Sequence, residues 1–199
     1  MLGNSKNKTE ILSTKNDGIK KASALLAKGN LVVFPTETVY GLGADATSSS
    51  AISKLYAVKK RPKINPLIVH VKNMSAAYSL AEIPQGAEPL IEKFWPGPLT
   101  LVVQKKRTSS SISDLVTSNL ETIALRIPDH PIALKLLNEF SKPIAAPSAN
   151  LSGKLSTTRA KDVFSNFDGQ IAAILDGGSC SIGLESTIVG FEGKKPVIL

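Results

Sequence analysis

The sequence predicts an α/β fold with a mixed, twisted sheet flanked by helices. Apolar stretches typical of strands alternate with helical patterns, and no internal repeat or long linker divides the 199 residues. Hydrophobic residues make up 42% and charged residues 20% of the chain, as in ordinary globular proteins. Because this length suits one sizeable core, we expect a single domain over 1–199, with 1–15 as a loose tail.

The first half of the chain is expected to alternate helices and strands. Apolar residues recur at helical spacing after Asp17, which can cap a helix that Gly29 ends. The serines at 48–50 can cap a second helix, which Pro62 ends. The predicted elements are helix 19–29, strand 31–34, helix 51–60, strand 66–71 and helix 74–80.

The second half continues the same alternation. A polar, serine-rich segment at 105–118 predicts a surface loop, and 147–153 predicts a polar turn. The other predicted elements are helix 86–94, strand 99–103, strand 122–127, helix 131–140, strand 144–146, helix 159–164 and strands near 171–175, 186–189 and 196–199.

The stretch LVVFPTETVYGLGA at 31–44 is the one around which the chain is organised. Its apolar start is a buried strand that should stop at Pro35. If the next residues stay extended, Thr36, Thr38 and Tyr40 share one face, and the glycines beyond them act as hinges or permit a close approach. Such a segment suits the wall of a small-molecule pocket, and a plain polar loop is the alternative.

Composition and charge exclude several classes of protein. No apolar run is long enough to span a bilayer, and the N-terminus lacks the apolar core of a signal peptide, so we expect a cytoplasmic protein with no membrane partner. A single cysteine excludes an internal disulfide and, with two histidines, argues against a zinc site. The net charge of +8 favours anionic partners such as nucleotides or RNA, and the alternative is that several lysines merely solubilise an N-terminal face.

Common nucleotide and hydrolase motifs are absent from the sequence. The glycines at 41–46 match a dinucleotide pattern, but Arg61 stands where an acid is required and a polar insert separates them from the strand. Gly153-Lys154 does not continue as a Walker A loop, and Ser148 lacks the glycines of a nucleophile elbow. Any ATP must therefore be held by scattered residues.

Two cationic positions and one histidine have open interpretations. Lys59 and Arg61 at the end of a helix either complement its dipole or neutralise phosphate. Arg126, on a strand face with small residues, needs an anion, which is either a protein carboxylate or a ligand. His70 on its own suits a core histidine. The polar segments 147–153 and 183–187, which adjoin strands, are typical of ligand sites in α/β proteins.

Taken together, these segments resemble the YrdC/Sua5 family of threonylcarbamoyl-AMP synthases. The resemblance runs from about residue 18 to the end and keeps the family's order. Its elements are PTETVYGLG at 35–43, KxR at 59–61, NPLIVH at 65–70, PGPLT at 96–100, RIPDHP at 126–131, APSANLSG at 146–153 and ESTIV at 185–189.

The resemblance implies a YrdC-like fold with a basic concave cavity and a nucleotidyltransferase that condenses L-threonine, bicarbonate and ATP, with Mg²⁺, to threonylcarbamoyl-AMP and pyrophosphate. A partner transferase then modifies tRNA. By resemblance, the L-threonine site comprises Thr38, His70, Arg126 and Ser186. The ATP site comprises Lys59, Arg61, Asn65, Thr122, Ala146, Ser148, Asn150 and Ser156, with no metal ligand expected from protein side chains.

Our mechanistic hypothesis assigns catalysis to Lys59 and Arg61, which with Mg²⁺ would stabilise charge on the triphosphate. Family members usually continue into an R-P-G segment whose arginine helps to bind ATP, whereas this sequence stops at Leu199; either the chain is truncated, the contact comes from elsewhere, or nucleotide binding is impaired. The second, smaller domain of the longer Sua5 branch is absent, so we expect a single-domain type or an isolated catalytic domain. The alternatives are a module that binds tRNA or double-stranded RNA without synthase activity, and a carbamoyl-adenylate domain of the hydrogenase-maturation type.

Overall fold

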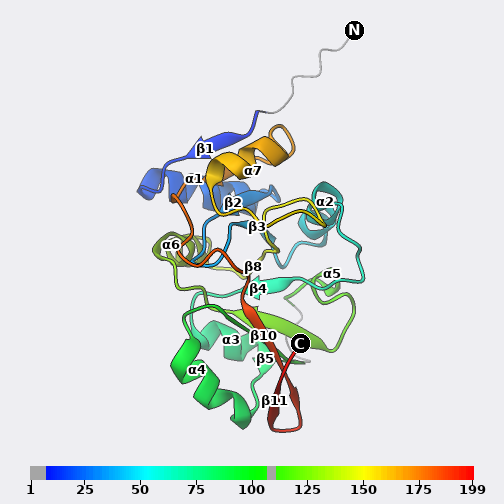
Figure 1. Ribbon diagram of the computed structural model, residues 1–199. Coiled ribbons are helices and arrows are strands. Elements are labelled where there is room, and N and C mark those ends of the chain that lie inside the picture. The colour runs from blue at the N-terminus through cyan, green and yellow to red at the C-terminus, as the bar shows by residue number, and fades with distance from the viewer. Residues whose placement is uncertain (1–7, 107–110) are drawn as a thin grey trace.

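The computed structural model describes residues 8–106 and 111–199, in which helices flank a sheet of eleven strands (Figure 1). The strands are β1 (Glu10–Leu12), β2 (Val32–Phe34), β3 (Gly41–Asp45), β4 (Ile68–His70), β5 (Ala81–Glu82), β6 (Leu99–Lys105), β7 (Thr122–Arg126), β8 (Ile144–Ala145), β9 (Ala173–Leu175), β10 (Thr187–Glu192) and β11 (Lys195–Ile198). The helices are α1 (Asn16–Ala27), α2 (Ser49–Lys59), α3 (Met74–Leu80), the short η1 (Gln85–Ala87), α4 (Glu88–Phe94), α5 (Asp114–Thr117), α6 (Pro131–Phe140) and α7 (Ala160–Phe167).

The sheet is mixed and twisted, which confirms the predicted fold class. Its strand order is β1-β9-β2-β3-β8-β4-β7-β6-β10-β11, with β5 beside β6. The pairs β1 with β9, β2 with β9, β4 with β7 and β6 with β10 are parallel, and the other pairs are antiparallel. In Figure 1, β1, α1 and α7 lie at one end of the sheet, and the β10–β11 hairpin lies at the other.

Two buried apolar clusters fill the interior, and β2 separates them. Leu31 and Val33 belong to one cluster, while Val32 and Phe34 belong to the other. Successive residues of a strand point to opposite faces, so a continuous apolar run is buried on both sides. This explains why the sequence LVVF reads as a strand without polar alternation.

Several predicted elements are confirmed close to their expected bounds. The helices α3 and α6 begin and end at the predicted residues. The Ser48 side chain caps α2 by accepting a hydrogen bond from the Ala51 N–H. Asp17 instead lies in the first turn of α1, whose N-cap is Lys15, and Gly29, with φ of +74°, lies just beyond the helix. A positive φ costs glycine little, which fits the predicted stop.

Two segments predicted to be irregular contain regular structure. The expected tail at 1–15 is wrong for its described part, because Glu10–Leu12 forms β1 and pairs with β9, where Leu12 is buried. Residues 1–7 lie outside the described residues. The expected loop at 105–118 is partly wrong, since Lys105 ends β6 and Asp114–Thr117 forms α5, capped by Ser113. Residues 107–110 of that loop lie outside the described residues.

Gly41 and Gly43, near the end of the stretch 31–44, belong to a strand and do not form a hinge. Gly41–Asp45 is β3, which pairs with β2 and β8. A Cβ built on Gly43 would lie 2.9 Å from the Phe34 ring and 2.9 Å from the Val32 carbonyl oxygen. The glycine therefore permits close packing against neighbouring chain, which was one of the two roles expected of it.

Candidate functional site

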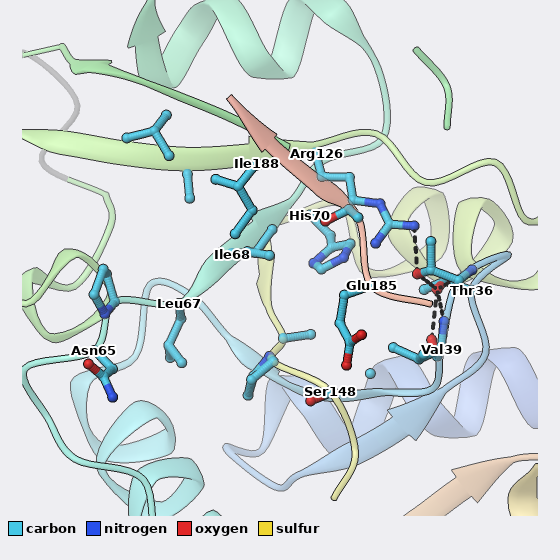
Figure 2. A pocket seen from close by; sticks show the side chains of 18 of the residues that line it. Thr36, Val39, Asn65, Leu67, Ile68, His70, Arg126, Ser148, Glu185 and Ile188 are labelled. Atoms are coloured by element: carbon cyan, nitrogen blue, oxygen red, sulfur yellow. Dashed lines mark hydrogen bonds between the residues drawn. The ribbon is translucent and has the colours of Figure 1, made fainter. Parts of the chain in front are cut away.

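A cavity of about 530 Å³ lies over the middle of the sheet and collects most of the predicted site residues. Figure 2 shows Arg126, His70 and Thr36 on one side of it and Asn65 on the other. The predicted residues that line it are Thr38, Arg61, Asn65, His70, Thr122, Arg126, Ala146, Ser148 and Ser186. We call Thr38, His70, Arg126 and Ser186 the arginine end, and Arg61, Asn65, Thr122 and Ser148 the loop end.

Arg126 is the last residue of β7, and three contacts hold its guanidinium. Its Nη2 donates to Glu37 Oε1 at 2.7 Å and to Thr38 Oγ1 at 2.9 Å, while its Nε donates to the Gly97 carbonyl at 3.2 Å. Only 4% of Arg126 and 5% of Glu37 is exposed, so this is a buried ion pair. The anion that the sequence required beside Arg126 is thus a protein carboxylate.

Thr36 and Thr38 form a hydroxyl pair that fixes the direction of their hydrogen bonds. Their Oγ1 atoms are 2.8 Å apart, and Thr36 Oγ1 donates its proton to the Val39 carbonyl at 2.7 Å. Because Thr36 has a single hydroxyl proton, Thr38 must donate to Thr36. Thr38 also accepts from Arg126, which leaves one of its lone pairs for a ligand. Thr36 lines the cavity too, as the predicted pocket wall of Thr36, Thr38 and Tyr40 requires, although the resemblance had assigned it no ligand.

The parallel register of β4 and β7 sets His70 beside Arg126. His70 is 3% exposed, its ring meets Phe34 edge-on with centroids 5.8 Å apart, and its Nδ1 has no hydrogen-bond partner among the described residues. Burial and the charge of Arg126 lower the pKa of His70 to about 3. The imidazole is therefore neutral at pH 7. At the same end, Ser186 Oγ and Thr100 Oγ1 are hydrogen bonded at 2.7 Å.

Lys59 lies behind the loop end and does not line the cavity. Its ammonium donates to the carbonyls of Ser148 at 2.7 Å and Asn150 at 2.8 Å, and to Asn150 Oδ1 at 3.1 Å. Asn150 in turn accepts from the Ser148 hydroxyl at 2.5 Å. Burial, with repulsion from Arg61, lowers the pKa of Lys59 to about 8. Lys59 and Asn150 thus hold Ser148 in place from behind.

Arg61 reaches the cavity from the residues that follow α2. The helix ends at Lys59, its C-cap Lys60 has a left-handed φ of 54°, and this turn directs Arg61 toward the next loop. There its Nε donates to the Asn65 carbonyl at 3.1 Å and its Nη2 to the Pro66 carbonyl at 3.0 Å. Arg61 is half-buried, so a cation stands on the cavity wall with access to solvent.

Glu185 is a cavity residue that we had not predicted. It is the one carboxylate among the described residues that line the cavity, and it accepts a hydrogen bond from Ser156. Ser156, predicted for ATP, does not itself line the cavity. The loop that carries Glu185 is fixed to the central stretch, because the N–H groups of Ile182 and Gly183 donate to the carbonyls of Glu37 and Thr38.

Comparison with known proteins decides the family. The sequence model of the Sua5/YciO/YrdC family, described as "Telomere recombination", matches residues 24–199. The chain belongs to this family. It is 50% identical over 192 residues to the threonylcarbamoyl-AMP synthase of Bacillus subtilis, which covers 96% of this chain and 55% of that protein. The enzyme of the same name from Pyrococcus abyssi is 48% identical over 182 residues, covering 91% of this chain and 53% of that protein.

Among solved structures, the chain resembles Pyrococcus abyssi Sua5 complexed with L-threonine. The TM-score is 0.91 and the identity 45%, covering 96% of this chain and 57% of that one. The chain thus spans about half the length of these relatives. The family predicted from the sequence motifs is confirmed, and so is the fold.

Proposed function

We propose that this chain catalyses the formation of threonylcarbamoyl-AMP from L-threonine, bicarbonate and ATP, with release of pyrophosphate. The observation that carries the proposal is a single cavity with a buried, fixed Arg126 at one end and a second, accessible Arg61 at the other. Such a cavity can seat an amino-acid carboxylate and a nucleotide phosphate side by side. The names of its relatives support the same reaction.

L-Threonine would bind at the arginine end. Arg126 would pair with the carboxylate, and the free lone pair of Thr38 would accept a hydrogen bond from the amino group. Neutral His70 and the Ser186 hydroxyl complete the polar wall without adding charge. An amino group that is not hydrogen bonded to an anion is easier to deprotonate. Bicarbonate that takes up a proton would lose water to give CO₂, and the free amine would add to CO₂ to form a carbamate with release of a proton.

ATP would bind at the loop end, beside Arg61, Asn65, Thr122 and Ser148. We infer that a carbamate oxygen attacks the α-phosphorus in line, and pyrophosphate leaves. Arg61 would stabilise the charge that develops on the phosphates. Because Lys59 is bonded to the 148–150 carbonyls, its proposed contribution is to fix the loop that carries Ser148, and its charge acts from behind that loop.

The donor set suits a Mg²⁺ ion carried on ATP. No group of three or more His, Cys, Asp or Glu side chains gathers within 8–106 and 111–199, and Glu185 is the single cavity carboxylate in that part of the chain. Mg²⁺ commonly takes most of its ligands from phosphates and water, with one or two carboxylates. When bound with ATP, it would neutralise triphosphate charge, and Glu185 is the side chain of the described cavity wall that could serve as its ligand.

We further propose that the product passes to a threonylcarbamoyl transferase that modifies tRNA in the cytoplasm. In the described part of the chain, no helix is long and apolar enough to cross a membrane. An RNA-binding module of the same fold, without synthase activity, is the competing function. RNA affinity that falls steeply with salt, without turnover of ATP, would distinguish it.

The test is pyrophosphate release by the purified chain with ATP and Mg²⁺. We expect release only when L-threonine and bicarbonate are both present, and each omission should abolish it. Release that does not depend on L-threonine would contradict the proposal. A folded chain that binds tRNA but releases no pyrophosphate under any condition would favour the RNA-binding function instead.

A further inference from the structure

Glu37 is the partner of Arg126 but lies behind the cavity wall. Thr36, Thr38 and Val39 line the cavity, whereas Glu37 does not. Its Oε1 accepts from Arg126 at 2.7 Å, and its Oε2 is buried without a partner among the described residues. A carboxylate buried with one unsatisfied oxygen is costly, so its position beside the cavity points to a role beyond packing.

The charges of the buried side chains at the arginine end sum to zero. Arg126 and Glu37 cancel, and His70 is neutral because burial lowers its pKa to about 3. Nearby titratable groups are Tyr40, His130 and Cys180, and Glu185, which is exposed, lines the same cavity next to Ser186. Burial lowers the pKa of His130 and raises that of Cys180, so both are neutral at pH 7. A ligand at this end therefore meets a fixed cation whose charge is already balanced.

A balanced site discriminates among ligands by their net charge. An amino-acid zwitterion brings a carboxylate for Arg126 and an amine, and it leaves the buried end neutral. A carboxylate without the amine would leave one uncompensated negative charge in a poorly solvated site, which is unfavourable. Without Glu37, the buried cation would instead favour the bare anion.

We propose that Glu37 is a specificity-determining positioning residue, which makes the cavity select a zwitterionic α-amino acid over a simple carboxylate anion. This inference rests on the proposed binding of an amino acid at Arg126. It deepens that function, because it assigns the selection to a side chain that does not touch the ligand. Glu37 would also fix the orientation of the guanidinium, because its Oε1 accepts a hydrogen bond from Nη2 of Arg126. Figure 2 shows Arg126 and His70 facing the same end of the cavity.

The experiment is a calorimetric comparison of three ligands that differ in charge. They are L-threonine, its α-hydroxy acid analogue, in which a hydroxyl replaces the ammonium, and threonine amide, which lacks the carboxylate. The wild-type chain should bind L-threonine at least about tenfold more tightly than either analogue, since one unbalanced charge costs on the order of 1.4 kcal/mol or more. Equal affinity for L-threonine and the α-hydroxy acid would overturn the proposal, whether or not any variant folds.

The variant Glu37→Gln keeps a hydrogen-bond acceptor of similar shape but removes the charge. We expect its preference for L-threonine over the α-hydroxy acid to fall at least about tenfold, with tighter binding of the anion. If Glu37 had a purely structural role, the variant would lose affinity for both ligands by the same factor, and that result would contradict the proposal. Asp162→Asn, in the exposed face of α7, is the matched control because it makes the same change in net charge far from Arg126.

The outcomes also separate this inference from the proposed function. If the wild-type chain binds none of the three ligands, the amino-acid part of the proposed function fails and the selectivity fails with it. If L-threonine binds and supports pyrophosphate release, but Glu37→Gln leaves the ratio of affinities unchanged, only the role of Glu37 is wrong.

Discussion

The two ends of the cavity are built differently. At the arginine end, Thr38, His70 and Arg126 are between 0% and 4% exposed, and strand register and buried hydrogen bonds fix them. At the loop end, Asn65 is exposed and Arg61 is half-buried, and both belong to a loop. The first end is ordered before any ligand arrives, because β4 and β7 hold His70 and Arg126, and a buried hydrogen bond ties Thr38 to Arg126. The second is open, which suits a large ligand that keeps part of its surface in water.

Breaking the arginine end should give the largest effect. Arg126→Met leaves Glu37 buried without its partner, so we expect the free energy of unfolding to fall by about 3–5 kcal/mol and L-threonine binding to be lost. Urea denaturation and calorimetry measure the two effects. The double variant Glu37→Leu with Arg126→Met should recover much of the stability, because it buries neither charge, but not the binding. If Arg126→Met alone were as stable as the wild type, the ion pair would make no contribution to the free energy of unfolding.

Lys59 tests how the loop end is supported. Lys59→Ala leaves the 148–150 carbonyls without their donor, and a small displacement of Ser148 should lower turnover by about 100-fold. L-Threonine affinity should stay within about twofold, since Arg126 and Thr38 are untouched. Steady-state kinetics and threonine titration measure the two. Lys60→Ala is the control, because Lys60 is the exposed neighbour in the same turn. A near-normal rate in Lys59→Ala would show that Lys59 is not needed to hold the loop that carries Ser148.

His70 should make stability depend on pH. Burial lowers its pKa in the folded protein to about 3, below its ordinary value of 6.5, so the unfolded chain binds more protons between these two pH values. The stability is therefore fully present above pH 6.5 and is lost as the pH falls toward 3. His70 should account for about 2 kcal/mol of the loss between pH 7 and 5.

Denaturation of wild type and His70→Asn at both pH values isolates this contribution. The comparison is needed because burial also lowers the pKa of His130. His130→Asn retains a capping side chain for α6, so it serves as the matched variant. If the wild type and His70→Asn lose stability in parallel, the imidazole is not held neutral by burial.

All four residues predicted for L-threonine line the cavity, whereas Lys59, Asn150 and Ser156, predicted for ATP, do not. Arg126 on an apolar strand demands an anion nearby, and local pattern alone reveals that demand. The partner, Glu37, is 89 residues away and could not be assigned without the pairing of distant strands. The alternation that set Thr36 and Thr38 on one face was visible in the sequence, but the hydrogen bond that joins them was not.

Other features depended on contacts that local pattern does not encode. The glycines at 41–43 resembled a hinge, but Phe34 and Val32 approach so closely that β3 must be glycine-rich. The cations at 59–61 looked alike in sequence, yet the left-handed Lys60 turns Lys59 into the interior and Arg61 toward the cavity. Glu185 lies in the polar segment 183–187 that the sequence marked as typical of a ligand site, but nothing singled out its carboxylate, because an exposed carboxylate is common on any protein surface.

Arg61 gives the smallest and most local expected effect, and it sharpens the contrast between the two ends. Arg61→Ala removes hydrogen bonds to the Asn65 and Pro66 carbonyls at an accessible surface, so stability should change by less than about 1 kcal/mol. The loss of a phosphate partner should weaken ATP binding about tenfold, while L-threonine affinity is unchanged. Arg61→Lys should recover only part of the affinity, because an ammonium cannot reproduce the bidentate geometry. If the affinities for ATP and L-threonine fell equally, the two ends of the cavity would bind their ligands as one coupled site.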